Sequence, residues 1–291
     1  MPTQSGTTVR ISPRVARVTA NNPGMMTGAG TNTYVLGRTE IAVIDPGPCD
    51  EKHVEATLTA AIEHAPDAKI HWIIVTHTHP DHSPAAKLLA EKTGAKLVGC
   101  VLQDDGYQDR SFCVSRNVQH GDLIIGRDFT LEAIATPGHV ANHFCYFLRE
   151  EGLVFTGDHI MGGSSVVIIP PSGDMTDYLA SLARLKDYPI QQLLPGHGDA
   201  ITDPISTINV RISHRLRREE KILRRLRTHG EISLDALTPL VYDDVDPTLH
   251  RMAQASLWAH LLKLEKEGRA RQQFEQHWLF GERRWGLCSD V

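Results

Sequence analysis

The chain has 291 residues, a formal net charge of −5, and a composition of 41% hydrophobic and 22% charged residues. This composition excludes disorder, collagen and coiled coil as the main architecture, and no apolar run approaches the roughly 18 residues that a membrane span needs. The net negative charge disfavours a protein that coats nucleic acid, and five widely spaced cysteines argue against a disulfide framework. Histidine is abundant, at 16 residues, and it is the commonest metal ligand in proteins.

Charge is divided unevenly along the chain. Residues 203–291 carry 15 Lys and Arg against 13 Asp and Glu, a net of +2, which leaves a net of −7 on residues 1–202. Such a shift predicts two domains with these boundaries. Residues 1–39 lack acidic residues, as a transit peptide would, but Val9–Thr19 alternates like a strand. We therefore expect a cytoplasmic protein, or one of the mitochondrial matrix if the source is eukaryotic.

Strands and helices are mixed over the first 202 residues. Thr33–Leu36 and Ile41–Ile44 are β-branched runs separated by a short turn, which predicts a hairpin. Ile70–Thr76 predicts a buried strand that ends where the histidines begin. This mixture favours α/β layers over a purely parallel wound sheet. The other predicted helices are Glu51–His64, Pro84–Gly94 and Asp177–Lys186, and the other predicted strands are Lys96–Cys100, Asp122–Ile125, Phe129–Ala135, Phe144–Leu148, Leu153–Thr156 and Gln192–Leu194.

The last 90 residues have a different pattern. Pro204–Thr228 predicts a long helix, with arginines and lysines over much of the surface between residues 211 and 227. Its predicted apolar face, into which Glu219 intrudes, consists of Ile208, Ile212, Leu216, Leu223 and Leu226. Two more helices and two strands with a turn at Gly281 describe a small winged helix-turn-helix. Their predicted ranges are Ser233–Tyr242, Pro247–Glu267, Ala270–Glu275 and His277–Leu287.

Candidate metal ligands gather directly after the predicted strand Ile70–Thr76. Three imidazoles and one carboxylate occupy six consecutive positions, from His77 to His82. A core tolerates so many adjacent polar groups only when they are paired or bound to metal. Three more candidates each follow a glycine at a predicted strand end, where the backbone can turn sharply. They are His139, Asp158 and His197.

The spacing divides these side chains between two cations. We expect His77, His79 and His139 to share one ion, and Asp81, His82 and His197 to share the other. Asp158 has one oxygen for each ion and would bridge them. Imidazole nitrogen and carboxylate oxygen favour two Zn²⁺ per chain, with Mn²⁺ or Fe²⁺ as alternatives. Two such ions can hold a bridging hydroxide at neutral pH, so the prediction is a hydrolase in which Asp81, Asp158 and His143 are the candidate catalytic residues.

This pattern resembles the metallo-β-lactamase superfamily over residues from about 25 to 200. The resemblance implies an αββα sandwich with the dinuclear site at one edge of its sheets. It also implies that Asp45, in the run Val-Ile-Asp-Pro-Gly, supports the metal loop without being a ligand. Redox members of the superfamily carry a glutamate where His79 stands, and lactam-hydrolysing members usually lack Asp81. Redox chemistry and lactam hydrolysis are therefore not the primary expectations.

A narrower resemblance extends over nearly the whole chain. The segments Gly30–Gly37, Pro195–Gly198, Ile212–Arg215 and Leu261–Gly268 are similar to the lactamase-beta-like-2 group. Its animal members are mitochondrial single-strand endoribonucleases with a C-terminal winged helix. The resemblance therefore implies hydrolysis of RNA phosphodiesters. His159, after the predicted bridging acid, and Ile168–Pro171, a longer lip over the site, depart from the group and could change the substrate.

Two alternatives to RNA hydrolysis stay open at this point. The same centre could hydrolyse a thioester or another small ester, as glyoxalase-II-like and polyketide-thioesterase relatives do. Alternatively, the metal site could be inert in a module whose winged helix binds nucleic acid. The basic helix could contact phosphates or be a solvated face, and the small domain could form a homodimer or a wall of the metal cleft. We expect no membrane partner.

Overall fold

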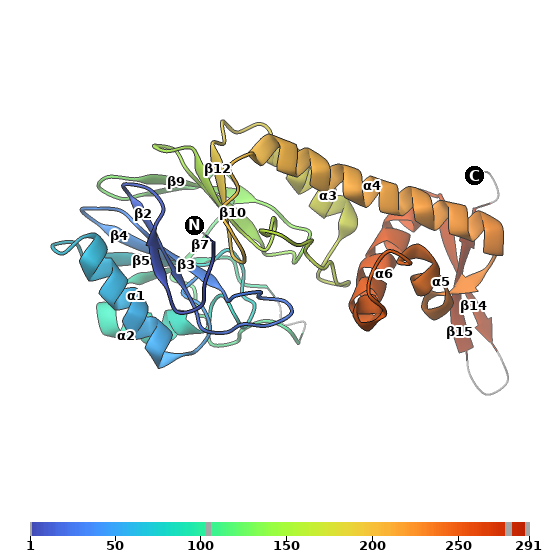
Figure 1. The fold of residues 1–291 in the computed structure, drawn as a ribbon, viewed down its shortest axis with the longest axis horizontal. Coiled ribbons are helices and arrows are strands. Elements are labelled where there is room, and N and C mark those ends of the chain that lie inside the picture. Colours follow the sequence, from blue (N-terminus) through green and yellow to red (C-terminus); the bar gives the residue numbers. More distant parts are fainter. Residues whose placement is uncertain (1, 103–105, 277–280, 289–291) are drawn as a thin grey trace.

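The structure is a computed structural model, and it describes residues 2–102, 106–276 and 281–288. Two sheets packed face to face carry helices on their outer faces, and a smaller unit of helices and a three-stranded sheet lies at the far end of a long helix (Figure 1). This is the expected αββα sandwich with a small C-terminal unit. No helix of the described part is both long and apolar enough to cross a membrane.

The first sheet has seven strands in chain order. Its first four strands are antiparallel, and the last four run parallel to one another. The helices α1 (Glu51–His64) and α2 (Ala85–Thr93) cover its outer face. The strands are β1 (Thr8–Arg10), β2 (Val15–Thr19), β3 (Asn32–Leu36), β4 (Ile41–Ile44), β5 (Ile70–Ile74), β6 (Lys96–Gly99) and β7 (Arg116–Asn117).

The second sheet has five strands in the order β12-β11-β10-β9-β8, and only the β11–β12 pair is parallel. Helix α3 (Met175–Leu185) and the first half of α4 (Pro204–His229) pack on its outer face, as their shared apolar cluster shows. The strands are β8 (Leu123–Ile125), β9 (Thr130–Ala135), β10 (Phe144–Leu148), β11 (Leu153–Gly157) and β12 (Gln192–Pro195).

One core lies between the two sheets and includes Tyr34, Phe129, Tyr146 and Phe155, each at most 2% exposed. Strands that are buried on both faces read as continuous apolar runs, which is why β4, β10 and β11 could be predicted. The prediction of one strand over Val9–Thr19 was wrong. Ser12 and Pro13 divide it into β1 and β2, because the hydroxyl of Ser12 accepts the N–H groups of Arg14 and Val15 and closes a turn.

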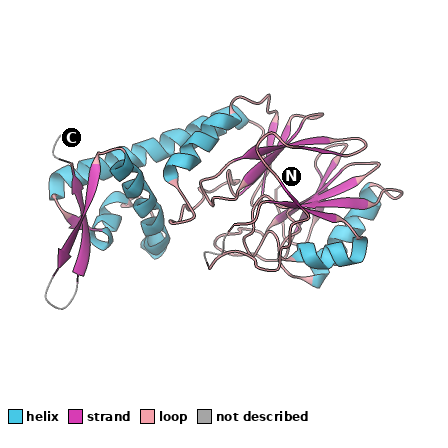
Figure 2. Cartoon of the chain, turned by 180° about the vertical axis from the view of Figure 1, so that it is seen from behind, coloured by secondary structure: helices cyan, strands magenta, loops and turns pink. Residues whose placement is uncertain are grey.

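The C-terminal unit follows α4, which runs from the sandwich to the far end of the molecule (Figure 2). Apolar residues of α4 contribute to two cores, Ile208 to that of the second sheet and Leu226 to that of the small unit. The domain boundary predicted at residue 203 stays a prediction, since α4 is shared. The remaining elements are β13 (Ile232–Ser233), α5 (Leu234–Val241), η1 (Pro247–Leu249), α6 (His250–Lys266), β14 (Ala270–Gln276) and β15 (Gly281–Leu287).

Two details of the tail differ from the sequence prediction. Gly281 is the first residue of β15, paired with Gln276, and does not form the turn. The predicted strand start at His277 lies outside the described residues. The predicted apolar face of α4 is also partly wrong, because Leu216 is 44% exposed. Glu219 is buried instead, where Lys263 and Arg269 donate hydrogen bonds to its carboxylate.

Candidate metal centre

The loop after β5 begins with a hydrogen-bonded anchor. Asp45, at the end of β4, has a positive φ of 50°. Its carboxylate accepts hydrogen bonds from the backbone N–H of Thr76 at 2.7 Å and from the Thr76 hydroxyl at 2.9 Å. It also lies 3.0 Å from Nδ1 of His82. Asp45 thus fixes both ends of the loop from Thr76 to His82, as the resemblance implied.

Three imidazoles converge as the first cluster. Nδ1 of His79 lies 2.9 Å from Nε2 of His77 and 3.1 Å from Nε2 of His139. The other ring nitrogen of His139 donates to the carbonyl oxygen of Val167 at 2.8 Å, which leaves Nε2 unprotonated and aimed at the cluster. The structure therefore brings the first predicted set together.

The second cluster combines two imidazoles with a carboxylate. Nε2 of His197 lies 3.2 Å from Nε2 of His82 and 3.1 Å from Oδ2 of Asp81. His82 is fully buried and His197 nearly so, whereas the side chain of Asp81 is 29% exposed. The second predicted set is therefore also assembled, at the ends of β5 and β12.

Asp158 lies between the two clusters. Its Oδ2 is 3.7 Å from Nε2 of His139, and its Oδ1 is 3.4 Å from Nε2 of His82 and 3.3 Å from Nε2 of His197. Oδ1 is buried, and within residues 2–102, 106–276 and 281–288 it has no hydrogen-bond partner. Gly157 permits this approach because a Cβ there would lie 2.3 Å from the Thr76 hydroxyl.

Hydrogen bonding alone does not account for these contacts. Nδ1 of His79 faces two ring nitrogens, and a single proton can serve only one of them. Nitrogens that bind one tetrahedral zinc ion at 2.0–2.1 Å lie about 3.3 Å apart, close to the separations of 2.9–3.2 Å between the imidazoles. The unpartnered oxygen of Asp158 fits the same explanation. The side chains present therefore suit divalent cations.

Burial and charge act differently on the two clusters. Burial lowers the pKa of His77 well below 6.5 and that of His79 to about 4, so these rings are neutral and offer lone pairs. Burial also opposes charge on His82, yet Asp81, Asp158 and Asp45 raise its pKa well above 6.5. The carboxylates thus favour positive charge in the second cluster, a demand that a divalent cation meets.

His143 lies behind the centre. It is fully buried, and its Nε2 accepts a hydrogen bond of 3.2 Å from the backbone N–H of Asp158. Because Nε2 is an acceptor, Nδ1 carries the proton and donates to the hydroxyl of Thr136 at 2.8 Å. This placement favours a role in positioning Asp158 over contact with substrate. His159 is also fully buried, and no described residue makes a hydrogen bond to either of its ring nitrogens.

A cavity of about 390 Å³ opens beside His139 and Asp158. Its walls come from the segment 161–167, from α4 and α6, and from residues between α5 and α6. The sequence pattern did not indicate that Arg215 and Tyr242 line a cavity, because Arg215 lies among the other basic residues of α4. The one available signal was the alternative that the small domain walls the metal cleft, which this cavity supports.

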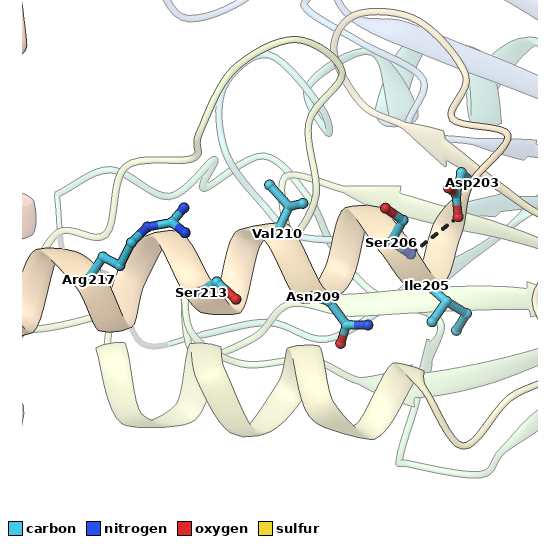
Figure 3. Close-up of a pocket in the computed structure, with 7 residues that line it drawn as sticks. All are labelled: Asp203, Ile205, Ser206, Asn209, Val210, Ser213 and Arg217. Atoms are coloured by element: carbon cyan, nitrogen blue, oxygen red, sulfur yellow. Dashed lines mark hydrogen bonds between the residues drawn. The ribbon is translucent and has the colours of Figure 1, made fainter.

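Another hollow, of about 540 Å³, lies on the outer side of α4, near Asp203 and Arg217 (Figure 3). None of its seven lining residues is a histidine or another candidate metal ligand. The smaller cavity at His139 and Asp158 is therefore the candidate substrate site.

Replacing Asp45 by Asn should weaken metal binding about 10–100-fold, the usual effect of losing a group that orients a ligand. Asn tolerates a positive φ, so the loop keeps its path while His82 loses its anionic partner. Competition with a metal indicator measures the change. Asp128→Asn is the matched control, because Asp128 also accepts backbone N–H groups, from Arg38 and Thr39, at a surface turn. Equal affinities in all three proteins would contradict the role of Asp45.

Comparison with known proteins agrees with this geometry. Residues 26–197 match the metallo-beta-lactamase superfamily, and residues 233–285 match the beta-lactamase associated winged helix domain. A beta-lactamase-like protein 2 homolog of Caenorhabditis elegans is 31% identical over 89% of this chain and 86% of its own length. An atrochrysone carboxyl ACP thioesterase of Aspergillus chevalieri is 31% identical over 97% of this chain and 89% of its own.

A solved structure shares the whole fold. The beta-lactamase domain protein of Burkholderia ambifaria superimposes with a TM-score of 0.80, at 19% identity, over 98% of this chain and 94% of its own. The superfamily match spans more than half of the chain, which confirms the expected fold and a metal-dependent hydrolase. The second match confirms the winged helix. The chain belongs to the metallo-β-lactamase superfamily.

Proposed function

We propose that this protein is a hydrolase that works with two divalent cations, held by the two clusters with Asp158 between them. The observation that carries this proposal is the carboxylate of Asp158, whose two oxygens face different clusters. Zinc suits this mixture of imidazole and carboxylate best, with manganese or iron as alternatives. Bound cations of this kind activate water and polarise the oxygen of the bond to be cleaved.

The side chains of the protein would orient the reaction. His139 and Asp158 line the cavity, so the reacting group lies against them. Asp45, His143 and the carbonyl of Val167 would keep the candidate ligands in place through the hydrogen bonds described above. In the hydrolysis of a thioester, a new carbon–oxygen bond replaces the carbon–sulfur bond, and the thiol leaves with a proton from water.

The cavity favours an acyl thioester as substrate. Its volume of about 390 Å³ lies at the lower end of the roughly 300–1,000 Å³ typical of small-molecule sites. Four methionines and further apolar side chains line it, which suits an acyl chain better than a nucleotide strand. The similarity to thioesterases points to the same class.

RNA hydrolysis is the second candidate, supported by the basic surface of α4. Several of these basic side chains form ion pairs within the protein: Arg218 pairs with Asp244, and Arg225 with Asp243. Only the most exposed arginines of α4 remain suited to phosphate contacts. They are Arg217, Arg224 and Arg227.

A side-by-side assay of a pentanoyl thioester and a fluorogenic RNA oligomer, with metal-loaded protein, tests this proposal. We expect the thioester to be cleaved with a kcat/KM on the order of 10⁴ M⁻¹s⁻¹ or more and the RNA far more slowly. Faster cleavage of RNA would make the thioester assignment wrong. Failure to cleave either substrate, with metal bound, would favour the non-catalytic binding module.

A further inference from the structure

One wall of the cavity carries a buried cation without a counter-ion. Arg215 of α4 is 5% exposed, and Nη2 of its guanidinium donates to the carbonyl oxygen of Val166 at 2.5 Å. Among the described residues, no carboxylate lies within ion-pair distance of Arg215. Its neighbour Arg218, by contrast, makes two hydrogen bonds to Asp244. The guanidinium lies over the ring of Tyr178, 5.3 Å from its centroid, but no carboxylate offsets the cost of burying the charge. Arg215 therefore has the character of a binding group.

A second, independent feature lies in the same wall. Tyr242 is only 6% exposed, and its buried hydroxyl has no hydrogen-bond partner among the residues that the structure describes. Buried tyrosine hydroxyls usually find a partner. Nδ1 of His214 is likewise buried without a partner in the described part of the chain, and both residues line the cavity with Arg215. The cavity thus presents a guanidinium that no carboxylate of the described residues pairs with, and a hydroxyl donor for which those residues supply no acceptor.

These groups lie close to the metal centre. Arg215 holds the carbonyl of Val166, while His139 holds the carbonyl of Val167. Consecutive residues are about 3.8 Å apart between their Cα atoms, so the cation and the first cluster are tied to adjacent positions of one segment. A small molecule in this cavity can therefore reach both.

The remaining walls are apolar and adaptable. Four of the six methionines of the chain, Met25, Met26, Met161 and Met252, line the cavity, together with Val245. Methionine is unbranched and polarisable, and it packs against flexible chains of varied shape. The cavity therefore combines an apolar path with a cationic end, which is the complement of an amphipathic acyl group.

We propose that Arg215, assisted by the hydroxyl of Tyr242, binds an anionic group of the substrate, so that the preferred substrate is a short acyl thioester with a terminal carboxylate. This inference rests on the thioester hydrolysis proposed above. The guanidinium holds the carboxylate through charge-assisted hydrogen bonds, the methionines hold the chain, and the thioester carbonyl lies at the metal centre. A phosphate on the thiol portion offers the same chemistry from another source.

A set of four substrates distinguishes these sources. Pentanoyl and glutaryl thioesters are each made with pantetheine, which is neutral, and with 4′-phosphopantetheine. We expect glutaryl to exceed pentanoyl in kcat/KM by about 10–100-fold on either thiol, the range of a hydrogen bond to a charged group. If the 4′-phosphopantetheine thioesters are cleaved faster than the pantetheine thioesters, and this preference requires Arg215, the anion site stands. The anion that it binds is then the phosphate of the thiol portion. Equal rates for all four substrates would overturn the inference.

Substitutions of Arg215 distinguish a role in binding the anion from a purely structural role in the protein. Arg215→Gln keeps an N–H donor for the carbonyl of Val166, and we expect it to lower the glutaryl-to-pentanoyl ratio of kcat/KM from about 10–100 to about 1, through a higher KM for the glutaryl substrate. Arg215→Lys should restore part of the preference, since it keeps the charge. Arg211→Gln is the matched control. Arg211 ties the same segment to α4, through Met161 and Ser165, but does not line the cavity. Its loss should leave the preference unchanged.

A binding measurement keeps this inference distinct from the proposed function. Calorimetric titration of metal-loaded protein with glutarate should show about 10–100-fold weaker binding in Arg215→Gln than in the unsubstituted protein. If no thioester is cleaved and this difference is present, the anion site stands and the thioesterase proposal fails. If thioesters are cleaved but glutarate binds equally to both proteins, the anion site is wrong and the thioesterase proposal stands.

Discussion

Asp158→Asn is expected to lower hydrolytic turnover on the order of 10³-fold or more and to reduce the metal content of the protein. The two oxygens of this carboxylate face different clusters, and loss of one member of a set of catalytic residues that act as a unit costs this much or more. An amide of the same shape keeps the backbone but removes the charge that balances His82 and His197. Thioester turnover and elemental analysis measure the two effects.

Asp187→Asn is the control for this substitution, because Asp187 is an exposed carboxylate of the segment that follows α3. It should leave turnover and metal content unchanged. Retention of full activity and full metal content in Asp158→Asn would show that the two clusters do not share this carboxylate.

Phe155→Ala is expected to destabilise the protein by about 3–5 kcal/mol, the usual cost of removing a buried aromatic ring from a core. Phe155 is 1% exposed on β11, and its ring packs edge-on against Tyr34 of the opposite sheet, with centroids 5.1 Å apart. The cavity left between the sheets cannot collapse without moving both. Urea denaturation followed by circular dichroism gives the free energy of unfolding.

Ile62→Ala serves as the comparison, since Ile62 of α1 is 63% exposed. Its effect should remain within about 0.5 kcal/mol, as for other surface positions. A loss of less than about 1 kcal/mol in Phe155→Ala would contradict the packing of the two sheets around this ring.

The sequence predicted those features that depend on local pattern. Helix α1 and strand β10 match their predicted ranges because apolar periodicity and capping residues mark their limits. The candidate ligands could be found because each follows a strand end, and at His139, Asp158 and His197 a glycine allows a sharp turn. The ends of β5 in the first sheet and of β9, β11 and β12 in the second lie at the same edge of the sandwich, so side chains distant in sequence meet there.

Features that depend on contact between distant segments could not be predicted in this way. In a helix with one apolar face, arginine is expected on the exposed face. Arg215 and Arg218 of α4 are nevertheless buried, because carbonyl oxygens of the segment 161–167 and of α5 accept their hydrogen bonds. The cavity is likewise formed by segments that are distant in the sequence, since its walls come from the sandwich and from the C-terminal unit. Its size and lining, which favour a small acyl substrate, became visible only in three dimensions.

Anomalous scattering from crystals of metal-replete protein, recorded at the zinc absorption edge and checked by elemental analysis, tests the two-cation centre. We expect two peaks on either side of the Asp158 carboxylate, about 3.5–4 Å apart, one among His77, His79 and His139 and the other among Asp81, His82 and His197. The absence of both peaks, or metal bound elsewhere in the protein, would contradict the dinuclear centre and the hydrolase proposed from it.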